Sequence, residues 1–183
     1  MPLSERRRTA RRKRALAYWG VAFGLYLSLW FGASLAPPYW LHVGMLFVHL
    51  SSIIVGLGAA VFLEFNGALW TIGRRTLADV RHAERSVSAL AWIGIIGLFV
   101  SGAFLQPNLD DPLTAMKMLA VLVVAMNGVA MTRLTGELAR LPASVPFGSL
   151  PQRLRLWCLW SAFVSQAGWW TAVIIGMINT ALR

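Results

Sequence analysis

The sequence predicts an all-α membrane protein, a polytopic bundle of five transmembrane helices. Two observations lead to this prediction. Five apolar stretches reach or exceed the ~20 residues that cross a hydrocarbon core of about 30 Å, and the arginines gather in every second gap between them. Lipid offers backbone amides no hydrogen-bond partners, so each stretch should be a helix. The predicted spans are residues 15–36, 40–66, 87–106, 113–134 and 156–182.

The distribution of charge predicts the orientation. Residues 1–14 form a strongly basic arm, and the second and fourth gaps are also rich in arginine. The first gap carries no charge, and the third contains Asp110 and Asp111. Because short loops rich in Lys and Arg stay in the cytoplasm, we expect the N-terminus inside and the C-terminus outside. The net charge of +10 follows from this pattern, so no nucleic-acid partner is needed to explain it.

The first span, 15–36, follows the basic arm and ends near Ala33-Ser34-Leu35-Ala36, which resembles a signal-peptide cleavage site. Its apolar part exceeds the roughly 7–15 residues of a signal peptide, so we expect a retained anchor. The connections are short, and residues 15–183 should form one membrane domain behind the cytoplasmic arm. A lone Cys158 allows no internal disulfide and no cysteine-ligated iron–sulfur cluster.

Polar residues inside spans are costly and mark the first places to look for function. In the second span, His42, His49 and Gly56 follow one another at steps of seven and share a face with Met45 and Ser52. This small, polar face lets a helix or a flat ligand approach closely, and both interpretations stay open. Glu64, near the inner end of the same span, is expected to pair with Arg74 or Arg75.

The fourth span adds Lys117 and Asn127, and the fifth adds Gln166. The second and fourth spans both enter from outside, so His49 and Lys117 fall in the outer half of the membrane. Lys117 lies about 6 Å into its span. The simplest interpretation of Lys117 is a snorkelling side chain whose ammonium reaches the headgroups. The alternative is that it faces a common site with His49.

Three segments carry a family resemblance. In 48–66, Val48-His49 precedes a glycine- and alanine-rich half. Segment 92–102 is an apolar helix ending in glycine, and 113–133 begins near Lys117 and runs into Asn127 and Arg133. This pattern resembles a superfamily of small membrane bundles that includes HemJ-type protoporphyrinogen IX oxidases and copper resistance protein D. The resemblance implies a four-helix core plus one extra N-terminal helix, and haem b binding through His49 and Lys117.

Three functions remain in competition. The first is a haem b protein with a redox role, in which His49 binds iron and Trp169, Trp170 and the glycine face wall the porphyrin. The second is copper handling, with His42, Met45 and His49 as candidate metal ligands, since thioether and imidazole suit Cu(I). The third is a scaffold or accessory subunit without chemistry. Expected partners are the lipid bilayer and a second copy or a membrane subunit. Arginine-rich, lysine-poor usage suggests a bacterial inner membrane.

Overall fold

The computed structural model describes residues 3–181, and that part of the chain is helical with no strand. Its helices are α1 (Leu3–Ser34), α2 (Tyr39–Thr71), α3 (Leu77–Gly102), α4 (Pro112–Leu138), the short 3₁₀ helix η1 (Phe147–Ser149) and α5 (Gln152–Ala181). The five α-helices are all long and apolar enough to cross a membrane. The predicted fold class is therefore confirmed, and the chain has the architecture of an integral membrane protein.

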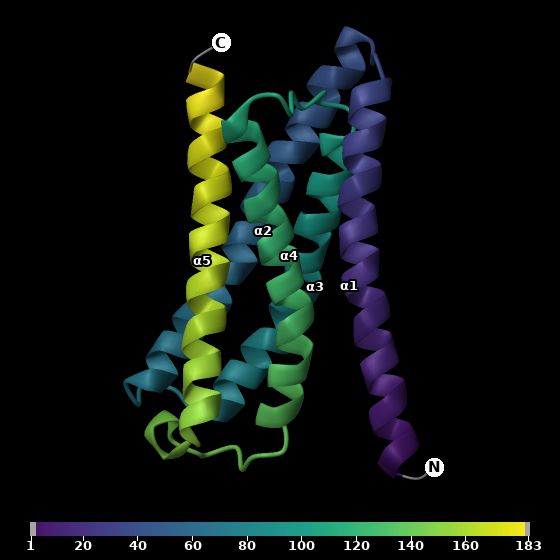
Figure 1. Cartoon of the computed structure of the whole chain (residues 1–183). Coiled ribbons are helices and arrows are strands. Elements are labelled where there is room, and N and C mark those ends of the chain that lie inside the picture. Colours follow the sequence, from purple (N-terminus) through teal and green to yellow (C-terminus); the bar gives the residue numbers. More distant parts are fainter. Residues whose placement is uncertain (1–2, 182–183) are drawn as a thin grey trace.

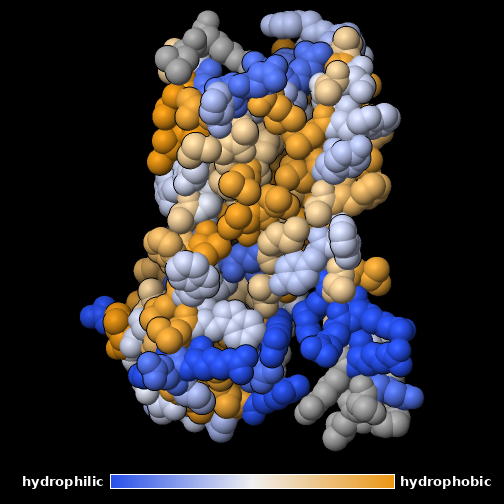
Figure 2. Space-filling view, viewed as in Figure 1, coloured by the Kyte–Doolittle hydropathy of each residue, from blue (hydrophilic) through white to orange (hydrophobic). Residues whose placement is uncertain are grey.

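The five long helices run alternately up and down (Figure 1). The N-terminus and the connections 72–76 and 139–151 lie at one end of the bundle, which holds Arg74, Arg75 and Arg140. The C-terminus and the connections 35–38 and 103–111 lie at the other end, with Asp110 and Asp111. Figure 2 shows hydrophobic residues across the middle of this face and hydrophilic residues gathered toward both ends. We call these ends inner and outer, following the positive-inside rule.

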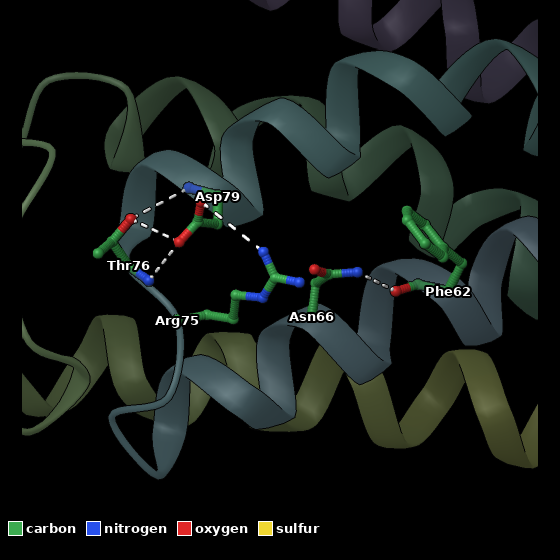
Figure 3. Close-up of polar contacts among 5 residues, drawn as sticks. All are labelled: Phe62, Asn66, Arg75, Thr76 and Asp79. Carbon is green, nitrogen blue, oxygen red and sulfur yellow. Dashed lines mark hydrogen bonds and ion pairs between the residues drawn. The ribbon is translucent and has the colours of Figure 1, made fainter.

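The third helix differs most from its predicted span. It begins at Leu77 rather than at residue 87, because Thr76 and Asp79 form a reciprocal capping box. The Thr76 hydroxyl accepts from the Asp79 amide at 3.3 Å, and the Asp79 carboxylate accepts from the Thr76 amide at 2.8 Å (Figure 3). His82 therefore lies on a helix, at an exposed position.

The outer end of α3 is also shorter than predicted. The helix ends at Gly102, and the chain then turns so that Gln106 adopts a positive φ of 46°. The Gln106 side-chain amide donates to the carbonyl of Leu35 at 2.7 Å, just after α1 ends. An apolar run that continues through a turn explains why hydropathy alone extended this span to residue 106.

Helix α1 packs into the bundle through small residues spaced four apart. Gly24 faces the ring of Phe99, and the Ser28 hydroxyl donates to the Phe99 carbonyl at 2.6 Å. A Cβ atom on Gly32 would lie 2.9 Å from Cδ of Pro107. Small side chains allow such close approach in membranes. The additional helix is thus an integral part of the fold, and its helical conformation extends through residues 3–14 of the predicted arm.

Helices α2 and α3 make the tightest seam. A Cβ atom on Gly94 would lie 2.5 Å from Cα of Gly56, and one on Gly97 would collide with the Ser52 side chain. The small face of α2 is therefore filled by α3 over these residues. Helix packing is the correct interpretation of this part of the face, and the flat-ligand interpretation is wrong there, because α3 brings its own glycines to the same positions.

The inner end is closed by a cluster of apolar side chains from several elements, namely Trp70, Leu77, Leu134, Leu138 and Leu150. The Trp70 indole donates to the Val145 carbonyl at 3.0 Å. The Arg81 guanidinium donates to the carbonyls of Leu138 and Leu141, the latter at 2.7 Å. These carbonyls belong to the last turn of α4 and its continuation, and that of Leu138 also accepts from the Leu141 amide, so Arg81 adds donors at this helix end.

Helices α4 and α5 are joined by polar contacts within the membrane region. The Asn127 amide donates to the Ser161 carbonyl at 2.9 Å, and the Ser161 hydroxyl donates to the Asn127 side-chain oxygen at 2.8 Å. Nearer the inner end, the Arg133 guanidinium lies 5.5 Å from the ring centre of Trp157. Asn127, a sequence candidate for function, is therefore used to hold two helices together.

Candidate functional site

The outer half of the bundle contains a histidine held in a defined orientation. His49 of α2 is half-buried, and its Nδ1 lies 2.8 Å from the hydroxyl oxygen of Ser101 on α3. Ser101 is fully buried and donates its own proton to the Gly97 carbonyl at 2.6 Å. A hydroxyl has a single proton, so Ser101 accepts from His49 Nδ1–H. In the neutral imidazole this leaves the lone pair on Nε2 for a ligand.

The tight seam below this pair explains why the two side chains meet. Gly94 and Gly97 bring the α3 backbone against α2, and Ser101 follows Gly97 by one helical turn on the same face. A larger residue at either glycine would push the helices apart. The orientation of His49 thus depends on the packing of α3.

Lys117 of α4 is half-buried and close enough to His49 to act on it electrostatically. Its position follows from the start of α4, where Pro112 occupies the first turn and the Asp111 carboxylate accepts from the amides of Leu113 and Thr114 at 3.3 and 3.0 Å. The structure therefore joins His49 and Ser101 directly, with Lys117 of a third helix within electrostatic range of His49. That these residues bind a cofactor stays a prediction.

The Asp111 side chain caps the N-terminus of α4. Hydrogen bonds from the Thr114 hydroxyl and from the backbone of Thr114 and Leu113 lower the pKa of its carboxyl. The Asn179 amide of α5 also approaches the Asp111 carboxylate at 3.4 Å and the Thr114 hydroxyl at 3.0 Å. The first turn of α4, from which Lys117 is placed, is consequently tied to the outer end of α5.

The other candidate metal ligands are less closely arranged. His42 and Met45 are half-buried on α2, and His42 precedes His49 by about 10 Å along the axis. Among residues 3–181, no group of three or more His, Cys, Asp or Glu side chains could hold a metal ion. Methionine is not among these four residue types, so the copper set of His42, Met45 and His49 stays a prediction.

The two tryptophans that were expected to line a porphyrin site are arranged differently from the prediction. Trp169 is buried, and its indole packs against Gly56 so closely that a Cβ atom there would lie 2.6 Å from the ring. Trp170 is about half exposed and donates to the Gln166 side-chain oxygen at 2.9 Å. The glycine face and Trp169 thus contact each other directly, and they leave no room for a porphyrin between them.

Glu64 also departs from its prediction. It is half-buried and lies within reach of the side chains of Ser165 and Gln166 of α5. Arg75 instead approaches Asp79 at 4.0 Å (Figure 3). The salt bridge expected between Glu64 and Arg74 or Arg75 is therefore wrong, because α2 continues for nearly two turns beyond Glu64 and the arginines follow it in the connection.

Two contributors were missed by sequence reasoning, Ser101 beside His49 and Ser165 beside Glu64. Each is a small polar residue within an apolar helix, and this was the only signal available. Comparison with protein-family models, with curated proteins and with solved structures found no match. The resemblance to HemJ-type oxidases and copper resistance protein D therefore depends on the sequence pattern alone.

Proposed function

We propose that this protein binds haem b in the outer half of a bacterial inner membrane, where His49 would ligate the iron. The observation that supports this most is the contact of His49 Nδ1 with Ser101, which leaves Nε2 for a metal. Metal-binding histidines commonly donate their other ring N–H to a second group that fixes the ring orientation. Histidine is also the usual proximal ligand of haem iron.

Lys117 supplies a positive charge within electrostatic range of this imidazole. An ammonium suits pairing with a propionate carboxylate of haem b, and an amine can also serve as a second axial ligand. The donor set therefore fits the group. When bound, haem supplies one-electron chemistry. The chain's own contribution is to orient His49 through Ser101, to place a cation next to it and to exclude water below it.

The packing limits where such a ligand fits. Gly56 contacts Gly94 and Trp169, so the binding region lies on the outer side of Gly56. A small apolar gap between α3, α4 and α5 is lined by Ile95, Val121, Val124, Gly168, Trp169 and Ala172. It lacks polar lining and is too narrow for a porphyrin. The outer ends of α2 and α4, which carry His49 and Lys117, are the region that remains.

Absorbance of the purified protein tests the proposal. Protein expressed with ample haem and purified in mild detergent should show a Soret band, and His49→Ala should abolish it. Ser101→Ala should weaken haem affinity by roughly 10–100-fold, the usual cost of losing the hydrogen-bond partner that orients a ligating histidine. His82→Ala, at an exposed position, is the matched control and should keep the band. If the band survived in His49→Ala but disappeared in His42→Ala, the ligand would be His42, and the assignment of His49 would be wrong.

A scaffold without chemistry is the second candidate, and the α2–α3 seam favours it. Most of the small face of α2 serves packing, as a purely structural bundle would require. This function predicts no Soret band and no bound metal in any preparation. Copper found by elemental analysis without a Soret band would instead support the copper interpretation, with loss of copper expected in Met45→Leu.

A further inference from the structure

A second polar cluster lies far from His49, in the inner half of α2. Glu64 follows His49 by fifteen residues, or about 22 Å along the helix. Its carboxyl is half-buried and lies within reach of the side chains of Ser165 and Gln166 of α5. An ionisable side chain within a membrane-spanning helix is costly and marks a functional site by default. The proposed haem site makes no use of this residue.

The orientation of Gln166 decides what the cluster offers to Glu64. The side-chain oxygen of Gln166 accepts from the Trp170 indole at 2.9 Å. Its amide nitrogen is therefore the end left to donate to Glu64. The Ser165 hydroxyl can donate or accept. This arrangement satisfies a carboxyl oxygen and does not present the set of oxygens that a metal cation would require.

The elements packed against α2 carry charged and titratable groups, several of which have partners of their own. On α3 and α5 and in the connection before α3 they are Arg74, Arg75, Asp79, Arg81, His82, Glu84, Arg85, Arg153, Arg155 and Cys158. Arg75 pairs with Asp79, Arg81 binds the carbonyls that end α4, and Arg155 approaches the Gly148 carbonyl at 3.4 Å. Among the described residues, no ion pair includes Glu64, and the side chains of Ser165 and Gln166 near its carboxyl are neutral.

A carboxylate with only neutral partners at this depth is unfavourable, whereas the neutral acid fits the cluster completely. In the acid form, the O–H group donates to the Ser165 hydroxyl and the carbonyl oxygen accepts from the Gln166 amide. We propose that Glu64 is an intramembrane proton-binding site, in which the carboxyl holds a proton that exchanges with water at the inner end of the bundle. The ligand is a proton, and the site is independent of haem.

A hydrophobic carbodiimide tests this proposal, because it adds to protonated carboxyl groups in apolar surroundings. The acid proton passes to a carbodiimide nitrogen, the carboxyl oxygen bonds to the central carbon, and acyl transfer to nitrogen leaves a stable adduct with the mass of the whole reagent. Wild-type protein in detergent should gain one adduct, located on Glu64 by peptide mass spectrometry. Labelling should fall as the buffer changes from mildly acidic to alkaline. A water-soluble carbodiimide should not label Glu64.

Glu64→Gln should remove the adduct, and Glu137→Gln should keep it, because Glu137 pairs with Arg140 at 3.4 Å near the inner end. Mapping of the wild-type adduct needs no variant, so a folding defect in Glu64→Gln would not prevent the test. An adduct on another carboxyl, labelling that does not depend on pH, or no labelling of folded protein would each overturn the proposal.

Discussion

A single hydrogen atom in place of a side chain decides how α2 and α3 meet. Gly94 lies against the backbone of Gly56, where an added Cβ would come within 2.5 Å of Cα. The Gly94→Ala variant should therefore lose about 1–3 kcal/mol of stability, the usual cost of overpacking. Unfolding in mixed detergent, followed by circular dichroism, measures this loss.

The matched control is Gly58→Ala on α2, the helix that Gly94 packs against, where a Cβ atom would meet nothing within 4 Å. This variant should be as stable as wild type or slightly more stable, since alanine favours helix. Equal stability of the two alanine variants would show that the Gly56–Gly94 contact does not determine the seam.

At the residue scale, the depth of a side chain in the membrane could be predicted from the sequence, but the side chains that it contacts could not. The rise per residue and the direction of each span were enough to place His49 and Lys117 at similar depth. The partner of His49 was not predictable, because Ser101 is brought to it by the register of α3 on α2, which the periodicity of one helix does not contain. The same limit explains the wrong partner for Glu64, whose contacts come from α5.

At the element scale, the start of α4 depends on a charged cap. Hydrogen bonds, first from the Thr114 side chain, lower the pKa of Asp111 in the folded state. A depressed folded-state pKa means that this contribution is present at neutral pH, above the unfolded-state pKa, and is lost as the pH falls through the folded-state value. The melting temperature of wild type should therefore drop on acidification below the ordinary carboxyl range.

Asp111→Asn separates the cap from the charge. Asparagine is also a good N-cap, so this variant should remain folded while the acid-dependent part of its stability decreases. Asp111→Ala should be less stable at every pH, and Asp110→Asn should keep the wild-type profile. Thermal melts over a series of buffers measure all four proteins. An unchanged acid profile in Asp111→Asn would contradict the role of this carboxylate.

Element boundaries were predicted least well where local hydrogen bonds compete with hydropathy. The capping box of Thr76 and Asp79 starts α3 within polar sequence, which a search for apolar stretches passes over. At its other end, apolar residues continue into the turn near Gln106. The existence and number of spans were predictable because each has to cross the same thickness of hydrocarbon.

At the scale of the whole molecule, the arginine-rich end should face the cytoplasm. Single cysteines at Asn108 and Ser144, both exposed in connections at opposite ends, report this in a Cys158→Ala background. A membrane-impermeant maleimide should label Asn108→Cys in intact bacterial cells and Ser144→Cys only after permeabilisation. The reverse pattern would invert the orientation assigned to both polar sites.

The up-and-down order of the bundle was predictable from the alternation of charge, but the lateral order of its helices was not. Gly24, Ser28 and Gly32 bind α1 to α3 through spacing that also occurs in many unrelated helices. Only the structure shows which small face meets which. The positions of His49 beside α3 and Glu64 beside α5 follow from that lateral order.

The insertion of the Trp169 indole against Gly56 has an electrical consequence. Because the ring carbons of Trp169 contact Gly56 directly, no continuous chain of water molecules can run along this seam between His49 and Glu64. The two polar regions are thereby insulated from each other. If Glu64 exchanges its proton at the inner end as proposed, this contact separates that exchange from the region of His49, so the bilayer keeps its voltage.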